Sequence, residues 1–183
     1  MNSKQISVTP TRFKKGTIYG DFKAMCGTIK TLDNYKNSVC LFNDNHKQWL
    51  LADPKNPNFK NKRNHLAGGG NASCRPFQID GHSIGIPTGP YKSLNQIVII
   101  DGNKRVKVKT VIDMACDRIV DLFIKYPNKH VLYYSINPND PPDSIKLGLG
   151  IFKGIVGKDV IDYITSSIHL IPDKYNEKMN PSK

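Results

Sequence analysis

Glutamate is almost absent from this chain of 183 residues. Fourteen of the fifteen acidic residues are aspartate, and the single glutamate, Glu177, belongs to the polar C-terminal stretch. Any catalytic carboxylate in the body of the chain is therefore an aspartate. Lysine and arginine together number 27, which gives a formal net charge of +12 at pH 7. That charge predicts attraction to nucleotides, polyanions or anionic surfaces, and it excludes none of the three.

Long apolar runs and paired cysteine motifs are also missing. No run approaches the ~20 residues of a membrane span, and no signal peptide opens the chain, so we expect a soluble protein without a membrane partner. Its expected location is the cytoplasm, or the host cytoplasm if the chain is viral. The histidines and cysteines are too scattered for a metal site, so we expect no metal or cofactor, and free buried thiols. The four cysteines are Cys26, Cys40, Cys74 and Cys116.

The apolar residues are gathered in short blocks that alternate between two periodicities. Compact runs at 38–42, 83–87, 97–100 and 131–136 predict strands, and 106–109 can pair with 97–100 as a hairpin. Helical spacing predicts helices over about 110–126 and 158–169, and the polar last dozen residues predict a frayed tail. A helix followed by a buried strand is typical of a parallel sheet, so we expect one α/β domain over 1–183 with its core at about 38–170.

Two of the predicted strands end abruptly in polar residues. Asn43, Asp44 and Asn45 follow the first, and Asn137 follows the strand at 131–136. In an open α/β sheet the loops at the carboxyl ends of the strands meet at one crevice. We therefore expect these side chains to lie close together and to contact a ligand there.

Three consecutive glycines, Gly68, Gly69 and Gly70, precede a segment that can begin a helical turn. A glycine loop at a helix N-terminus presents unpaired N–H groups to an anion, and Arg75 can add further donors. A second glycine-rich loop starts at Gly148. Together the loops predict a cradle for a nucleotide diphosphate. The triplet is equally compatible with a flexible surface loop, because neither a Walker A motif nor GxGxxG is present.

The order of these motifs resembles the macrodomain superfamily, and it is most like the small macro-like proteins of phages and bacteria. The resemblance covers about 38–170 and includes the "GIPT" strand that ends at Thr88. It implies a three-layer α/β/α fold with a mixed central sheet. It also implies binding of ADP-ribose or a related NAD-derived nucleotide, either to sequester a signal or to recognise ADP-ribosylated protein or nucleic acid.

The resemblance also assigns residues to parts of that ligand. Asn45 matches the asparagine that faces the distal ribose, and the three glycines match the loop beside that ribose and the diphosphate. The family's Asn-Ala-Ala-Asn motif is absent. The second phosphate loop would supply Gly148, Gly150, Ile151 and Phe152. The remaining expected ligand contacts are Asn43, Asn71, Arg75, Thr88 and Asn137.

Two alternatives to simple binding stay open. The first is an ADP-ribosyl hydrolase acting on modified protein or nucleic acid, in which Asn45 holds the ribose and Asp44 or His65 serves as the base. Binding alone is favoured, because no complete catalytic constellation stands out. The second alternative is nucleic-acid binding through the many exposed cations, although no recognised nucleic-acid-binding motif is present.

Overall fold

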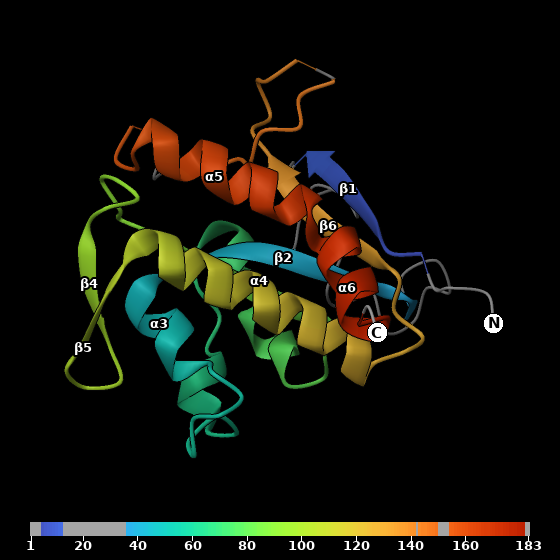
Figure 1. Cartoon of the computed structure of the whole chain (residues 1–183), viewed down its shortest axis with the longest axis horizontal. Helices are drawn as coiled ribbons and strands as arrows, with labels where there is room; N and C mark the ends of the chain where they lie inside the picture. Colours follow the sequence, from blue (N-terminus) through green and yellow to red (C-terminus); the bar gives the residue numbers. More distant parts are fainter. Residues whose placement is uncertain (1–4, 13–35, 142, 150–153, 182–183) are drawn as a thin grey trace.

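The computed structural model describes residues 5–12, 36–141, 143–149 and 154–181. A four-stranded sheet runs through its centre with the strand order β1-β6-β2-β3, and Figure 1 shows β1, β6 and β2 in that order. All neighbouring strands in this sheet are parallel, so the carboxyl ends of all four strands lie on the same side of the sheet. The strands are β1 (Ser7–Arg12), β2 (Ser38–Asn45), β3 (Ser83–Gly89) and β6 (Val131–Ile136).

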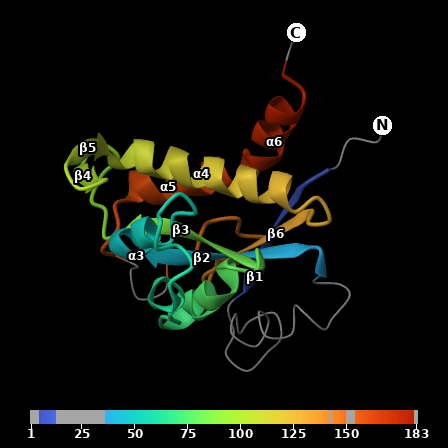
Figure 2. The same cartoon turned by 90° about the horizontal axis from the view of Figure 1, so that it is seen from below.

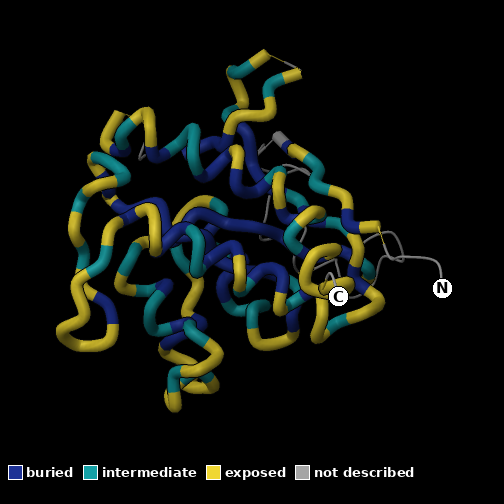
Figure 3. The backbone as a smooth tube through the Cα atoms, viewed as in Figure 1, coloured by how far each residue is buried: buried dark blue, intermediate teal, exposed yellow. Residues whose placement is uncertain are grey.

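Strand β2 is buried from its first residue to Asp44 because both faces of the sheet are covered. Side chains alternate across a strand, and here Val39 and Leu41 belong to one apolar cluster while Cys40 and Phe42 belong to another. A continuous apolar run of this kind is typical of a parallel sheet between two layers. Figure 3 shows the buried path of this strand through the middle of the molecule.

Helices cover one face of the sheet and a 3₁₀ segment covers the other. Figure 2 shows α4 and α5 above the sheet and residues 70–78 below it. The larger apolar cluster lies beneath the helices, where α4 buries a stripe that includes Val111, Ile119 and Phe123. The helices are α3 (His46–Leu51), α4 (Val108–Lys125), α5 (Lys158–His169) and α6 (Ile171–Met179), and the 3₁₀ segments are η1 (Lys62–His65) and η2 (Gly70–Gln78).

The antiparallel strands form a separate hairpin, β4 (Ile97–Ile100) and β5 (Lys104–Lys107). Asp101 and Gly102 make its turn with positive φ angles of 48° and 76°. The hairpin stands at the margin of the molecule beside the start of α4 (Figure 1). In the described residues the central sheet is therefore parallel rather than mixed, since the one antiparallel pair lies outside it.

Most of the predicted elements are present with nearly the expected bounds. The α/β class, the parallel sheet, the strand at 131–136 and the helix at 158–169 are confirmed. The three described cysteines are free and buried, as expected: Cys40, Cys74 and Cys116. Cys26 lies outside the described residues.

Two local predictions were wrong, and two elements were not anticipated. The frayed tail is wrong, because residues 171–179 form α6, which buries Ile171 and Tyr175 against the core. Strand β1 and the short helix α3 were not anticipated, since neither carries a clear apolar period. The strand expected to stop at Pro87 continues to Gly89, which the edge position of β3 permits because an edge strand needs no N–H there.

Candidate functional site

A cavity of about 670 Å³ lies at the carboxyl ends of β2 and β6. Its wall includes Asn43 and Asn45 from β2, Asn137 just after β6, and both predicted glycine loops. Gly68, Gly69 and Gly70 line it, and so does Gly148. The parallel pairing explains this convergence, because it brings the polar ends of both strands to the same edge.

The first glycine turn presents free backbone donors to the cavity. The first helical hydrogen bond of η2 runs from the N–H of Ala72 to the carbonyl of Gly69 (3.2 Å). Within the described residues, the N–H groups of Gly69, Gly70 and Asn71 donate to no partner. Gly70 has φ +56°, a left-handed conformation that favours glycine. The turn therefore has the donor arrangement that suits a phosphate.

Arg75 lies at the base of this turn, with its guanidinium held by a buried carboxylate. Its Nη2 donates to Oδ1 of Asp44 at 2.6 Å and its Nε to Oδ2 at 3.3 Å. Nη1 donates to the carbonyl of Leu66 at 2.7 Å, which ties the same group to the glycine loop. Burial raises the pKa of Asp44, while Arg75 and the N–H of Asn45 act in the opposite direction.

Asn43 anchors the start of the second glycine loop at the wall of the cavity. Its Nδ2 donates to the carbonyl of Gly148 at 2.6 Å, and the N–H of Gly148 donates to Ser135 at 2.8 Å. A Cβ at Gly148 would lie 2.6 Å from the nitrogen of Asn137, so only glycine fits there. The Oδ1 of Asn43 is buried and accepts no hydrogen bond from the described residues. An unpaired buried acceptor costs about 1–3 kcal/mol, so a donor from a ligand would relieve it.

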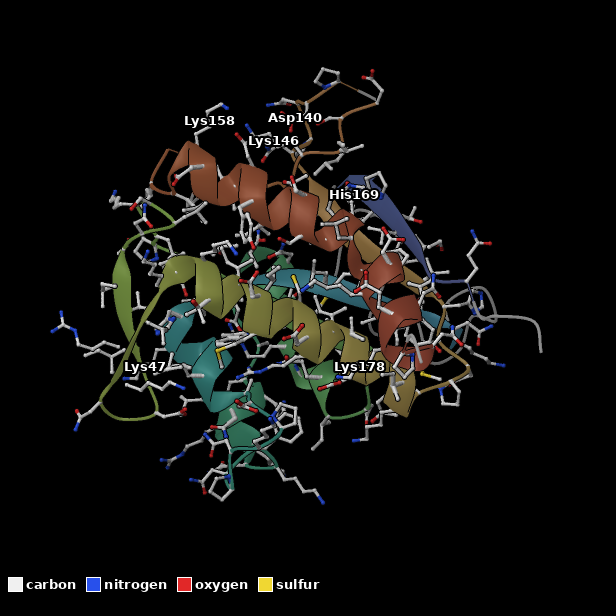
Figure 4. All side chains as sticks on the ribbon, viewed as in Figure 1. Lys47, Asp140, Lys146, Lys158, His169 and Lys178 are labelled. Atoms are coloured by element: carbon white, nitrogen blue, oxygen red, sulfur yellow. The ribbon has the colours of Figure 1, made fainter. Side chains whose placement is uncertain are left out.

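Asn45 and Asn137 are both positioned by their own side-chain contacts. The Oδ1 of Asn45 caps α3 by accepting from the N–H of Gln48 at 2.8 Å. Its Nδ2 group faces no acceptor within the described residues, which leaves two donors at the cavity wall. Asn137 donates to Asp140 at 2.9 Å, and Asp140 stands in the loop beyond β6 (Figure 4).

Three of the predicted residues do not line the cavity. His65 is buried against Phe59, whose carbonyl its Nε2 contacts, with the rings 5.0 Å apart in a T-shaped arrangement. Asp44 does not reach the cavity and pairs instead with Arg75, which lines it. Thr88 is buried, with its hydroxyl 3.4 Å from the carbonyl of Asp44. The structure thus separates both candidate bases from the cavity. Gly150, Ile151 and Phe152 lie outside the described residues.

The structure adds lining residues that the sequence analysis missed. Arg63 reaches the cavity from η1, and Gln48 reaches it from α3. Arg63 is exposed, and within the described ranges its guanidinium forms no ion pair. It belongs to a Lys- and Asn-rich stretch whose composition gave no hint of its position. Gln48 follows Asn45 by three residues, so the helix cap was the signal that could have found it.

A second cavity of about 450 Å³ lies between α4 and the outer edge of β3. Arg118 lies in its wall, with the guanidinium 3.6 Å above the ring of Trp49 and paired with Asp53. Burial lowers the pKa of Arg118. Arg118 and Asp53 therefore neutralise each other in the wall of this second cavity.

Among the residues described here, no three metal-ligating side chains come together in one place. Nor do those residues contain a helix long and apolar enough to cross a membrane. Comparison with models of protein families, with curated proteins and with solved structures finds no match to this chain.

Proposed function

We propose that this protein binds ADP-ribose or a related NAD-derived nucleotide in the cavity at the carboxyl ends of β2 and β6. The observation that carries the proposal is the link made by Asn43, which holds the second glycine loop against a cavity that the first glycine loop also lines. Two sets of features that suit different parts of a nucleotide thus meet in one cavity.

The polar groups divide into a set for phosphate and a set for ribose. The free N–H groups of residues 69–71 suit phosphate oxygens. The Oδ1 of Asn43 can accept a hydrogen bond from a ribose hydroxyl, and the Nδ2 of Asn45 can donate one. A ligand that carries both phosphate and sugar satisfies both sets, whereas inorganic phosphate satisfies only the first.

The finer fold assignment belongs to the same proposal. A parallel sheet with helices on one face and η2 on the other is compatible with a macrodomain-like three-layer fold. The order of strand end, glycine turn and second glycine loop supports that assignment. Recognition of ADP-ribosylated protein or nucleic acid is the biological role that such a cavity would serve.

Binding is proposed in preference to hydrolysis. An ADP-ribosyl hydrolase needs a base within hydrogen-bond reach of the attacking water. Asp44 instead contacts Arg75 through both carboxylate oxygens, and His65 is buried beside Phe59. Neither side chain lines the cavity. Among the residues proposed as catalytic, only Asn45 does.

A thermal-shift panel of ADP-ribose, NAD, AMP and cyclic dinucleotides tests the proposal. A ligand at a hundredfold excess over its dissociation constant stabilises the folded state by about 2.7 kcal/mol. For a domain of this size that corresponds to a rise in Tm of roughly 5–11 °C. We expect ADP-ribose or a cyclised relative to give the largest rise, and a panel without any rise would refute the proposal.

Asn45→Asp is the matched site variant, because aspartate keeps the helix cap but replaces the Nδ2 donors with negative charge. We expect calorimetry to show at least a tenfold loss of ADP-ribose affinity. Asn95→Asp makes the same change at an exposed position away from the cavity and should bind like the wild type. Equal affinities for all three proteins would place the ligand elsewhere.

A further inference from the structure

The loop between α3 and the first glycine turn carries an unusual concentration of positive charge. Residues 54–65, called the basic loop below, contain four cations and no acidic residue. All four are exposed, and none forms an ion pair within the described part of the chain. They are Lys55, Lys60, Lys62 and Arg63.

The basic loop is held in one conformation although its surface is exposed. Successive turns close with backbone hydrogen bonds of 2.8 Å from Phe59 to Asn56 and from Asn61 to Asn58. The Oδ1 of Asn61 also accepts from the N–H of Arg63 at 3.0 Å. At the end of the loop, Asn64 and His65 are only 5% and 6% exposed, and their side chains contact loop carbonyls from inside. The four cations therefore project from a fixed backbone.

The position of the basic loop connects it to the cavity. It forms the lowest part of the molecule in Figure 1, beneath α3. Arg63 lines the first cavity, whereas Lys55 lines the second one beside α4. The basic loop thus extends from the wall of the first cavity to the wall of the second one. Lys47 projects from the outer side of α3 (Figure 4) and is likewise exposed.

We propose that the basic loop binds the sugar–phosphate backbone of a single-stranded nucleic acid whose terminal nucleotide enters the cavity. This inference rests on the proposed function, because the end group uses the same N–H donors and asparagines as a free nucleotide. Phosphodiesters repeat one charge per nucleotide, and each cation that contacts one releases a condensed counterion. The strand is single because a base-paired terminal nucleotide would have to leave its duplex before it could enter the cavity.

An acidic protein segment is the competing partner for such a surface. It would satisfy the four cations of the basic loop, but it would leave the Oδ1 of Asn43 and the N–H groups of the glycine turn without a ribose and a phosphate. A nucleic acid satisfies the loop and the cavity with one continuous molecule. The geometry therefore favours the nucleic acid.

The test measures binding of short single-stranded DNA, labelled at one end and phosphorylated at the other, by fluorescence anisotropy between about 50 and 200 mM salt. The loop variant is Lys55→Gln/Lys60→Gln/Lys62→Gln. The control variant, Lys104→Gln/Arg105→Gln/Lys107→Gln, removes the same charge from the β5 strand of the hairpin. The slope of log affinity against log salt is negative, and each lost phosphate contact reduces its magnitude by about 0.7. We therefore expect the slope of the loop variant to be shallower than that of the wild type by about 2.

The control variant should lose less than half as much slope as the loop variant. Equal losses would mean that only total charge matters, and they would overturn the proposal. We also expect free ADP-ribose to compete with the DNA, and removal of the terminal phosphate to weaken binding. DNA binding without competition would overturn capture of the strand's end. Displacement by a poly-aspartate peptide as effective as unlabelled DNA would overturn the choice of nucleic acid.

Free ADP-ribose separates this proposal from the proposed function. Neither triple variant changes a residue that lines the first cavity, so both should retain the wild-type Tm rise with ADP-ribose. An intact Tm rise together with unchanged DNA slopes would overturn the role of the basic loop and leave nucleotide binding in place. Loss of slope in the loop variant, without any Tm rise in the wild type, would overturn the proposed function instead.

Discussion

The ion pair between Asp44 and Arg75 gives the most demanding test of the site's architecture. Asp44 is 1% exposed and Arg75 is 6% exposed, so little water reaches either charge when its partner is lost. In the variant Asp44→Asn the guanidinium keeps its bond to Leu66 but loses its counter-charge. Removing one partner of a buried pair costs about 3–5 kcal/mol. For a chain of this length the corresponding fall in Tm is roughly 6–20 °C.

Urea denaturation followed by circular dichroism measures that free energy of unfolding directly. The double variant Asp44→Asn/Arg75→Met removes both charges, and we expect it to lose about 1–3 kcal/mol less than the sum of the two single variants. Asp162→Asn breaks an exposed pair with Lys158, which extends from α5 into solvent (Figure 4), and should unfold close to the wild type. Wild-type stability of Asp44→Asn, or strict additivity in the double variant, would refute the reasoning.

Two further predictions concern Lys129 and Gly148. Burial lowers the pKa of Lys129 to about 8 from its usual value of 10.5. The unfolded chain therefore binds the proton more tightly, and stability should rise as pH increases from about 8 towards 10.5. Relative to Lys129→Met, the free energy of unfolding of the wild type, measured by chemical denaturation, should rise by about 1 kcal/mol between pH 7 and pH 9. A difference in unfolding free energy between the two proteins that stays constant with pH would contradict this. Gly148→Ala should cost roughly 1–3 kcal/mol in the same assay, because the added Cβ would lie 2.6 Å from backbone atoms. Gly69→Ala meets nothing within 4 Å at φ −75° and should unfold like the wild type, so equal losses would count against a steric cause.

The elements that the sequence predicted correctly are those whose own residues carry the pattern. Helix α5 follows a glycine and buries Val160, Ile164 and Ile168 at helical spacing, so local periodicity was enough to find it. Helix α6 buries only Ile171 and Tyr175, and its other residues are mostly polar. Its helical state depends on packing against α4 and β1, which no local pattern reveals.

The site shows the same division between local and tertiary information. Asn43, Asn45 and the glycines were found because strand ends and glycine turns are visible in the sequence, and the parallel sheet brings them together. The roles of Asp44 and His65 depend on partners that only the folded chain identifies. Asp44 belongs to β2 whereas its partner Arg75 belongs to η2, and the ring of His65 packs against Phe59. The sequence alone does not distinguish an aspartate with a free carboxylate from one that forms a buried ion pair.

The place of β6 in the sheet constrains the order in which the molecule can be assembled. This strand lies between β1 and β2, and it pairs Val131 with Ser7 on one side and with Ser38 on the other. On the ribosome, both neighbours have emerged long before β6 is synthesised. The native sheet can therefore form only if β1 and β2 have not already paired with each other when β6 emerges. A nascent chain halted before residue 131 would lack the strand that connects β1 to β2 and β3.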